Sequence, residues 1–155
     1  MQKAARITAQ EVAGTGMHWA FAPCVAVVQN ERWGRTYESF GETPDLVSSL
    51  GAAAVRGLRS RLPQGNFVLG CAKHFIGDGG TQDGIDQGNT VCDEATLREL
   101  FLPPYQAAIR EGVGSIMVSS SAHQIGPLFF PILSAGGCTY HADPRCYPRT
   151  SQDRV

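Results

Sequence analysis

The chain has 155 residues, of which 43% are hydrophobic and 17% are charged, and its formal net charge is -1. This size and composition are typical of one globular domain with its own core, and the near-neutral charge predicts neither nucleic acid nor a membrane surface as a partner. No stretch approaches the roughly 20 apolar residues of a membrane-spanning helix, and the N-terminus lacks the pattern of a signal peptide.

The first half of the chain predicts a helix, a strand, a second helix and a second strand. Helix-forming residues fill positions 4–14, and the aromatic-rich run at 18–23 is typical of a short strand. Thr43 is a suitable N-cap for the second helix, whose apolar residues recur at helical spacing and which should end near residues 63–65. The apolar run at 66–75 then predicts a strand that is covered on both faces.

The second half repeats the pattern. A long loop over residues 76–92 leads to Asp93, a good cap for a helix over 94–111, which Pro103–Pro104 must kink or split. Residues 114–120, GSIMVSS, predict a third buried strand. Strands this far apart cannot form hairpins, so the alternation predicts an α/β fold of parallel strands joined by crossover helices. An open doubly wound sheet and part of a TIM-like (β/α)8 barrel both satisfy this pattern.

Polar residues gather where such folds place their sites, at the carboxyl ends of the strands. Lys73 and His74 end the strand at 66–75, and they could share one pocket only if that strand stops or bulges there. A lysine donates to hydroxyl groups, and a neutral histidine donates from one nitrogen while it accepts at the other.

The loop ERWGRTYESFGE, residues 31–42, is the second polar group. The planar guanidinium of an arginine suits vicinal hydroxyls or a carboxylate, and an indole offers a flat face to a sugar ring. The alternative is a loop whose arginine pairs with Glu38 or Glu42 only to hold its own shape.

Other ligand sites are poorly supported. The glycine-rich loop at 77–84 lacks the spacing of nucleotide-binding motifs and does not open into a helix. The loop's three aspartates lack the closing glutamate of a calcium loop: Asp78, Asp83 and Asp86. A zinc-like trio in the tail has no clear fourth ligand: Cys138, His141 and Cys146. The sequence therefore predicts no metal and no cofactor.

Three blocks of the chain together resemble a known family. In order and spacing, FAPCVAVVQNERWGRTYESFGETPDLV, CAKHFIGDGGTQDGIDQGNT and LRELFLPPYQAAIREGVGSIMVS resemble the N-terminal barrel domain of family 3 glycoside hydrolases, and the plant-type exo-glucanase branch is the most similar. The resemblance implies that residues 1–121 form part of a TIM-like barrel. It implies a β-glucosidase-type hydrolase that removes terminal β-D-glucosyl residues from β-glucosides or β-glucan oligosaccharides. Members of this branch are usually secreted, which implies an extracellular location.

The resemblance also assigns roles to residues. It implies that Arg35, Lys73 and His74 bind the hydroxyls of the glucose in the innermost subsite, and that Glu38 and Glu42 support the arginine loop. Retaining hydrolysis needs two carboxyl groups. The family's nucleophile lies in a Ser-Asp-Trp or Ser-Asp-Tyr motif that this chain lacks, and its acid/base glutamate belongs to a second domain. We therefore expect no catalytic residue here and no activity from this chain alone. A glucoside-binding pseudoenzyme and an unrelated nucleotide-binding domain are the alternatives.

The resemblance stops near residue 120. Family members typically continue with a Tyr-Ser pair and an Asn-Gly turn, whereas this chain continues as SSAHQIGPLFFPIL. Residues 122–155 hold four of the nine prolines and show no periodicity, which predicts an irregular tail. We hypothesise that this tail is not family sequence and arose from a frameshift, a retained intron or a gene-model error.

Overall fold

The computed structural model describes residues 1–63, 65, 67–119 and 123–124. All of them belong to one unit, Met1–Ile125. The irregular tail expected over 122–155 lies outside the described residues, apart from the short strand β5, His123–Gln124. The zinc-like trio of the tail is outside them as well.

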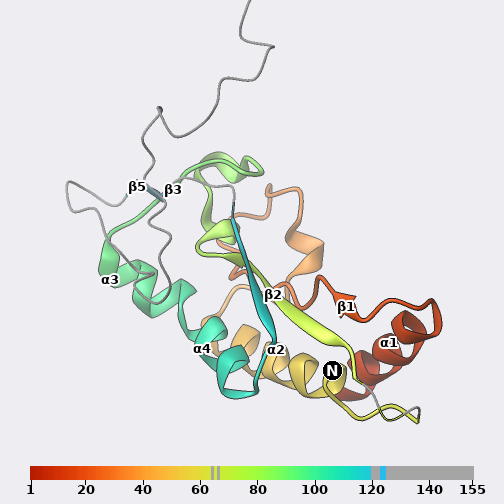
Figure 1. The fold of residues 1–155 in the computed structure, drawn as a ribbon. Helices are drawn as coiled ribbons and strands as arrows, with labels where there is room; N and C mark the ends of the chain where they lie inside the picture. Colours follow the sequence, from red (N-terminus) through yellow and green to blue (C-terminus); the bar gives the residue numbers. More distant parts are fainter. Residues whose placement is uncertain (64, 66, 120–122, 125–155) are drawn as a thin grey trace, which may run out of the picture. The chain divides into compact units, whose positions relative to one another are not determined.

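The strand β2, Leu69–Phe75, is the centre of a three-stranded parallel sheet, between β1, Trp19–Ala20, and β4, Ser115–Val118 (Figure 1). The chain continues to pair with β2 after β1 ends at Ala20. The N–H groups of Cys71 and Lys73 in β2 donate to the carbonyls of Ala22 and Pro23. A separate parallel pair joins β3, Thr90–Val91, to β5. The prediction of parallel strands is confirmed.

The helices agree with the prediction in order and differ at their ends. Helix α1 spans Gln2–Gly14, and α2 spans Pro44–Leu58. The last helical region is divided as its two prolines require, into α3, Glu94–Thr96, a π-helical turn, Leu97–Phe101, and α4, Pro103–Arg110. The Asp93 side chain caps α3 by accepting from the N–H of Thr96. Helix α2 ends earlier than predicted, because the chain turns back and the N–H of Val68 donates to the Leu58 carbonyl.

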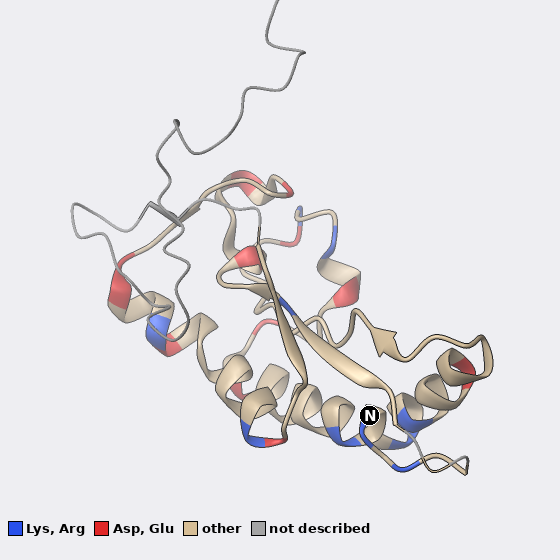
Figure 2. Cartoon of the chain, viewed as in Figure 1, with Lys and Arg blue, Asp and Glu red and all other residues tan. Residues whose placement is uncertain are grey.

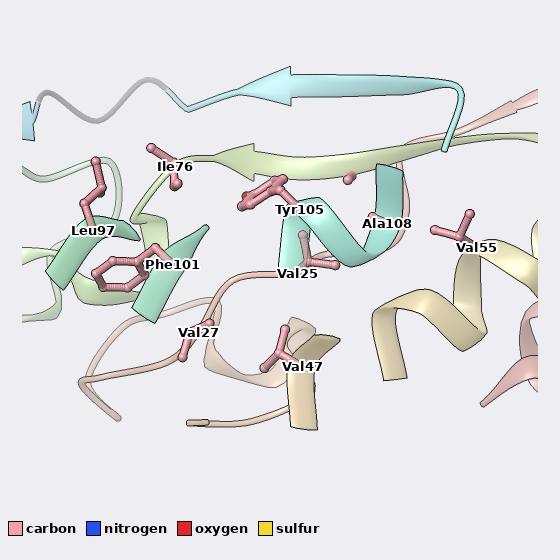
Figure 3. Close-up of a cluster of buried hydrophobic side chains, with 10 residues drawn as sticks. Val25, Val27, Val47, Val55, Ile76, Leu97, Phe101, Tyr105 and Ala108 are labelled. Carbon is pink, nitrogen blue, oxygen red and sulfur yellow. The ribbon is translucent and has the colours of Figure 1, made fainter. Parts of the chain in front are cut away.

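The main core joins the helices to β2 and to the extended segment before the arginine loop (Figure 3). Helix α2 supplies Val47 and Val55, and α4 supplies Tyr105 and Ala108. Val25 and Val27 come from the extended segment. The cluster is completed by Ala72, Ile76, Leu97 and Phe101. These side chains are all nearly inaccessible to solvent, so the core fixes the position of β2 against the helix layer.

The prediction that the third strand is buried is wrong. In β4, Ile116 is 37% exposed and Val118 is 54% exposed. The strand lies at the edge of the three-stranded sheet, so only β2 pairs with it among the described strands of that sheet. Among the described helices, none combines the length and hydropathy that crossing a bilayer requires.

Candidate functional site

The carboxyl end of β2 has an irregular backbone. The pairing of β2 with β4 shifts register between Ala72 and Phe75, so the bulge that neighbouring side chains need in order to reach one site is present. The Lys73–His74 and Phe75–Ile76 peptide bonds in this stretch are cis. Figure 2 shows that β2 and β4 carry almost no charge along their lengths, and Lys73 is the one Lys, Arg, Asp or Glu of β2.

One carboxylate joins two of the predicted binding residues. The Arg35 Nε donates to Glu38 Oε1 at 2.7 Å, and its Nη2 donates to Glu38 Oε2 at 2.8 Å. The same Oε2 lies 3.3 Å from Lys73 Nζ. The structure thus brings Arg35 and Lys73 together through Glu38, although they belong to segments far apart in the sequence. Glu42 takes no such part: its backbone carbonyl accepts from the Gln29 side chain.

Within the Arg35–Glu38–Lys73 cluster, Glu38 is held in its charged form by its partners. The paired hydrogen bond from Arg35 lowers the pKa of Glu38 from 4.5 to about 2, with a smaller lowering by Lys73 and an opposing effect of burial. The same pair raises the pKa of Arg35 above its ordinary value. Glu38 therefore remains a carboxylate at any physiological pH. It can orient two cations but has no proton to give as a general acid.

His74 is part of a second, more buried group. Its Nδ1 lies 2.8 Å from Asp78 Oδ2, and the Asp78 side chain is 3% exposed. The two atoms are close, but the contact does not have the alignment of a hydrogen bond from a ring N–H. The Ser119 hydroxyl donates to Asp78 Oδ1 at 3.0 Å, and the Ser119 N–H donates to the Phe75 carbonyl. This group links the ends of β2 and β4.

The loop that carries Arg35 is attached to the loop that follows β2. The Trp33 indole N–H donates to Asp86 Oδ1 at 3.1 Å, and the Gln29 N–H donates to the Gly79 carbonyl at 2.8 Å. Gly84 has a φ of +70°, and a Cβ at this position would lie 2.8 Å from the backbone nitrogen of Trp33. Only glycine allows the two loops to approach this closely.

The structure corrects the interpretation of Trp33. The sequence suggested that its indole could offer a flat face to a sugar, but the side chain is 1% exposed. It is a buried structural residue of the arginine loop. Sequence reasoning also missed Asp78 as a partner of His74, and the signal that could have found it was its position four residues after the histidine, at the end of a buried strand.

Two surface hollows occur on the described part of the chain, and the second is lined in part by the arginine loop. One is lined by the loop residues Gln82, Asp83, Ile85, Gly88 and Asn89, and the other lies beside the first turn of α2. Neither includes Arg35, Lys73 or His74. No group of three metal-ligating side chains occurs in the part of the chain that the structure describes. The site contains oriented hydrogen-bond donors on Arg35 and Lys73. Of the two nearby carboxylates, Glu38 is paired with these cations, and Asp78 accepts from the Ser119 hydroxyl.

Comparisons with known proteins agree on one family. The sequence model of the glycosyl hydrolase family 3 N-terminal domain matches residues 1–127. A β-xylosidase of Formosa agariphila is 39% identical over 122 residues, which are 76% of this chain and 17% of that protein. A lysosomal β-glucosidase of Dictyostelium discoideum is 36% identical, over 76% of this chain and 15% of that protein. A periplasmic β-glucosidase of Salmonella typhimurium also matches, at 32% identity over 74% of this chain and 15% of that protein.

Solved structures show the same likeness. The exo-1,3/1,4-β-glucanase of a Pseudoalteromonas species is 44% identical with a TM-score of 0.74, over 79% of this chain and 16% of that one. A β-glucosidase of Listeria innocua, solved as a mutant with laminaribiose, is 30% identical with a TM-score of 0.75, over 79% of this chain and 18% of that one. The chain thus spans less than a fifth of each of these proteins. The expected fold class, part of a TIM-like barrel, is confirmed.

Proposed function

We propose that this chain, which belongs to glycosyl hydrolase family 3 as part of its N-terminal domain, supplies the sugar-binding wall of a β-glucosidase-type hydrolase. The observation that carries the proposal is the Arg35–Glu38–Lys73 cluster at the carboxyl end of β2. A single carboxylate there aligns two cationic donors, which is how a protein prepares donors for the hydroxyls of a sugar ring before the sugar arrives.

The substrate class follows from the donors and from the relatives. Arg35, Lys73 and His74 would bind the hydroxyls of a terminal β-D-glucosyl residue, as the family resemblance implies. The likeness to an enzyme solved with laminaribiose supports a β-glucoside or a β-glucan oligosaccharide as the ligand. Family membership removes the alternative of an unrelated nucleotide-binding domain.

In this proposal the described residues bind the sugar, and none of them is assigned the role of nucleophile or acid/base. A retaining mechanism needs a nucleophilic carboxylate and an acid/base roughly 5–5.5 Å apart. Glu38 and Asp78 are the carboxylates near the donors, and both are paired with them. We therefore expect no measurable hydrolysis of an aryl β-glucoside by the purified 155-residue chain. Turnover well above that of a Lys73→Ala/His74→Ala double variant would contradict this.

Sugar binding is the direct test. Titration of the labelled chain with laminaribiose, followed by NMR, should shift the signals of Lys73 and His74 at millimolar ligand. The chain has one other lysine, the exposed Lys3, so Lys3→Ala is a matched control for Lys73→Ala. The proposal requires that Lys73→Ala weakens the response and that Lys3→Ala does not. An equal response in both variants, or none in the unmodified chain, would exclude this role.

We also propose that the family domain occupies residues 1–121 and that residues 122–155 are not family sequence. The family match ends at residue 127, six residues beyond the proposed boundary, so it supports an end of the family sequence near this position. Sequencing the transcript across codons 115–130 is the test. An uninterrupted mature message that encodes the tail would contradict a frameshift, a retained intron or a gene-model error.

For location, we propose the extracellular space. Two of the relatives are named as a lysosomal and a periplasmic β-glucosidase, and both of these compartments lie outside the cytosol, which supports the proposal. Detection of the native protein in the secreted fraction of its own cells would support this, and its retention in the cytosol would contradict it.

A further inference from the structure

His74 differs from the other two proposed sugar ligands in the way it is held. Arg35 and Lys73 share the carboxylate of Glu38, which is partly exposed, whereas His74 faces the buried carboxylate of Asp78. The two oxygens of Asp78 have separate partners, because Ser119 Oγ donates to Oδ1 while Oδ2 lies against His74 Nδ1. Asp78 is thus fixed from one side and acts on the imidazole from the other.

We infer that Asp78, held by Ser119, is a positioning residue that fixes the tautomer of His74 and leaves Nε2 to face the ligand. A carboxylate oxygen only accepts hydrogen bonds. A bare Nδ1 at 2.8 Å from that oxygen would set two lone pairs against each other, so the neutral ring must carry its proton on Nδ1. Nε2 is then a free acceptor for a sugar hydroxyl. The inference rests on the proposed function for its ligand, although the tautomer itself does not.

The geometry of the contact is consistent with a site prepared for its ligand. The carboxylate oxygen lies at hydrogen-bond distance from Nδ1, 2.8 Å, but without the alignment of a hydrogen bond. Hydrogen bonds at binding sites are often poorly aligned without ligand and straighten when it binds. A hydroxyl that donates to Nε2 would pull the ring into that alignment.

Ser119 holds the Asp78 carboxylate in position against His74 through its hydrogen bond to Oδ1. Its backbone N–H donates to the Phe75 carbonyl at 2.6 Å, so the hydroxyl is placed by the pairing of β4 with β2 rather than by the loop around Asp78. The orientation of His74 therefore depends on the neighbouring strand. Sequence alone could not show this dependence, because Ser119 and Asp78 are 41 residues apart.

The test measures which ring nitrogen of His74 carries the proton, and it needs no sugar. A negative result would therefore refute this inference without refuting the proposed function. The chain with 15N-labelled histidine is measured by NMR at a pH where the rings are neutral, since a bare ring nitrogen and a protonated one have well-separated shifts. His74→Gln identifies the signal of His74 among those of the four histidines. We expect the Nδ1–H form in the unmodified chain.

Three variants make the result specific. Asp78→Ala should lose the Nδ1–H form, and Asp78→Asn should retain it, because its amide oxygen still accepts. Ser119→Ala should reduce the fraction of that form without abolishing it. Asp83→Ala, which removes an exposed carboxylate from the same loop, should change nothing. An Nε2–H form in the unmodified chain, or an unchanged Nδ1–H form in Asp78→Ala, would overturn the inference. If Asp78→Ala fails to fold, the unmodified chain and Ser119→Ala still decide it.

Discussion

The centre of the sheet and its flanks differ sharply in burial. Along β2, Ala72 and Cys71 are almost completely buried, and Ala72 belongs to the continuous core that the helix layer forms against this strand. On the flanks, Trp19 of β1 is 51% exposed and Val118 of β4 is 54% exposed. The same types of apolar residue therefore meet solvent one strand away from a packed interior.

The difference shows which contacts the described residues complete by themselves. In a closed parallel barrel every strand has a neighbour on each side, whereas among the described strands of this sheet β1 and β4 each pair only with β2. Exposed apolar side chains on these flanks mark the surfaces that further strands would cover. Lys73 and His74 lie at the end of β2, which has a neighbouring strand on each side, and Arg35 is joined to Lys73 through Glu38. Their positions therefore depend on contacts that the described residues already make.

The largest expected effect compares two phenylalanines. Phe101 is 4% exposed in the core, and Phe21 is 54% exposed beside Trp19 on the flank. Phe101→Ala should lower the free energy of unfolding by about 3–5 kcal/mol, because it removes a buried aromatic ring and leaves a cavity. Phe21→Ala should cost about 1 kcal/mol or less, since its ring is largely solvated already. Urea unfolding followed by circular dichroism measures both, and equal losses would refute the contrast.

A smaller effect is expected where the two long helices cross. A Cβ on Gly57 of α2 would lie 2.5 Å from the Gln2 carbonyl oxygen and from the Ala5 Cβ, both in α1. Gly57→Ala should therefore force the helices apart and cost about 1–3 kcal/mol. Gly14→Ala is the control, because no atom lies within 4 Å of the Cβ it would introduce. A Gly57→Ala protein as stable as the control would mean that the helix layer yields easily.

The sequence predicted the centre better than the flanks. Apolar residues at helical spacing predicted α2, the apolar run at 66–75 predicted β2, and the Asp93 cap with Pro103–Pro104 predicted the divided helix over 94–111. The same reasoning made β4 a buried strand. An apolar run shows that a strand could be buried. Whether it is buried depends on the elements that pack against it, and these cannot be identified from the local sequence pattern.

The site was predictable to a similar degree. The sequence placed Lys73 and His74 at a strand end and Arg35 in the loop before the second helix, and their role as sugar ligands stays a prediction. The partners of these residues were harder to find. Glu38 was expected near Arg35 because it follows three residues later, but its contact with Lys73 depends on the pairing of distant segments. The burial of Trp33 depends in the same way on Asp86, which is 53 residues away.

The third prediction concerns the charge cluster at the end of the central strand. The folded pKa of Glu38 is lowered from 4.5 to about 2, so its ion pairs stabilise the fold above pH 4.5 and are lost as the pH falls towards 2. The unmodified chain should lose stability over that interval, and Glu38→Gln should remove part of the loss, of the order of 1 kcal/mol for a partly solvated pair.

Acid unfolding curves of three proteins decide this prediction. Glu11→Gln, which alters an exposed carboxylate on α1, is the matched control and should follow the unmodified chain. If Glu38→Gln also follows it between pH 4.5 and pH 2, the cluster does not stabilise the fold in the way described.

The smallest expected effect is at one hydroxyl group in the covered centre. Tyr105 is 2% exposed, and its OH has no hydrogen-bond partner among the described residues. Burial accordingly raises the pKa of Tyr105 well above its ordinary value. Removing an unpaired buried hydroxyl removes a desolvation penalty, so Tyr105→Phe should raise the free energy of unfolding by about 1 kcal/mol or leave it unchanged. Its ring contact with Phe75 is retained. A loss of about 1 kcal/mol or more in urea unfolding would show that the hydroxyl is satisfied in solution, and that this core includes a polar partner.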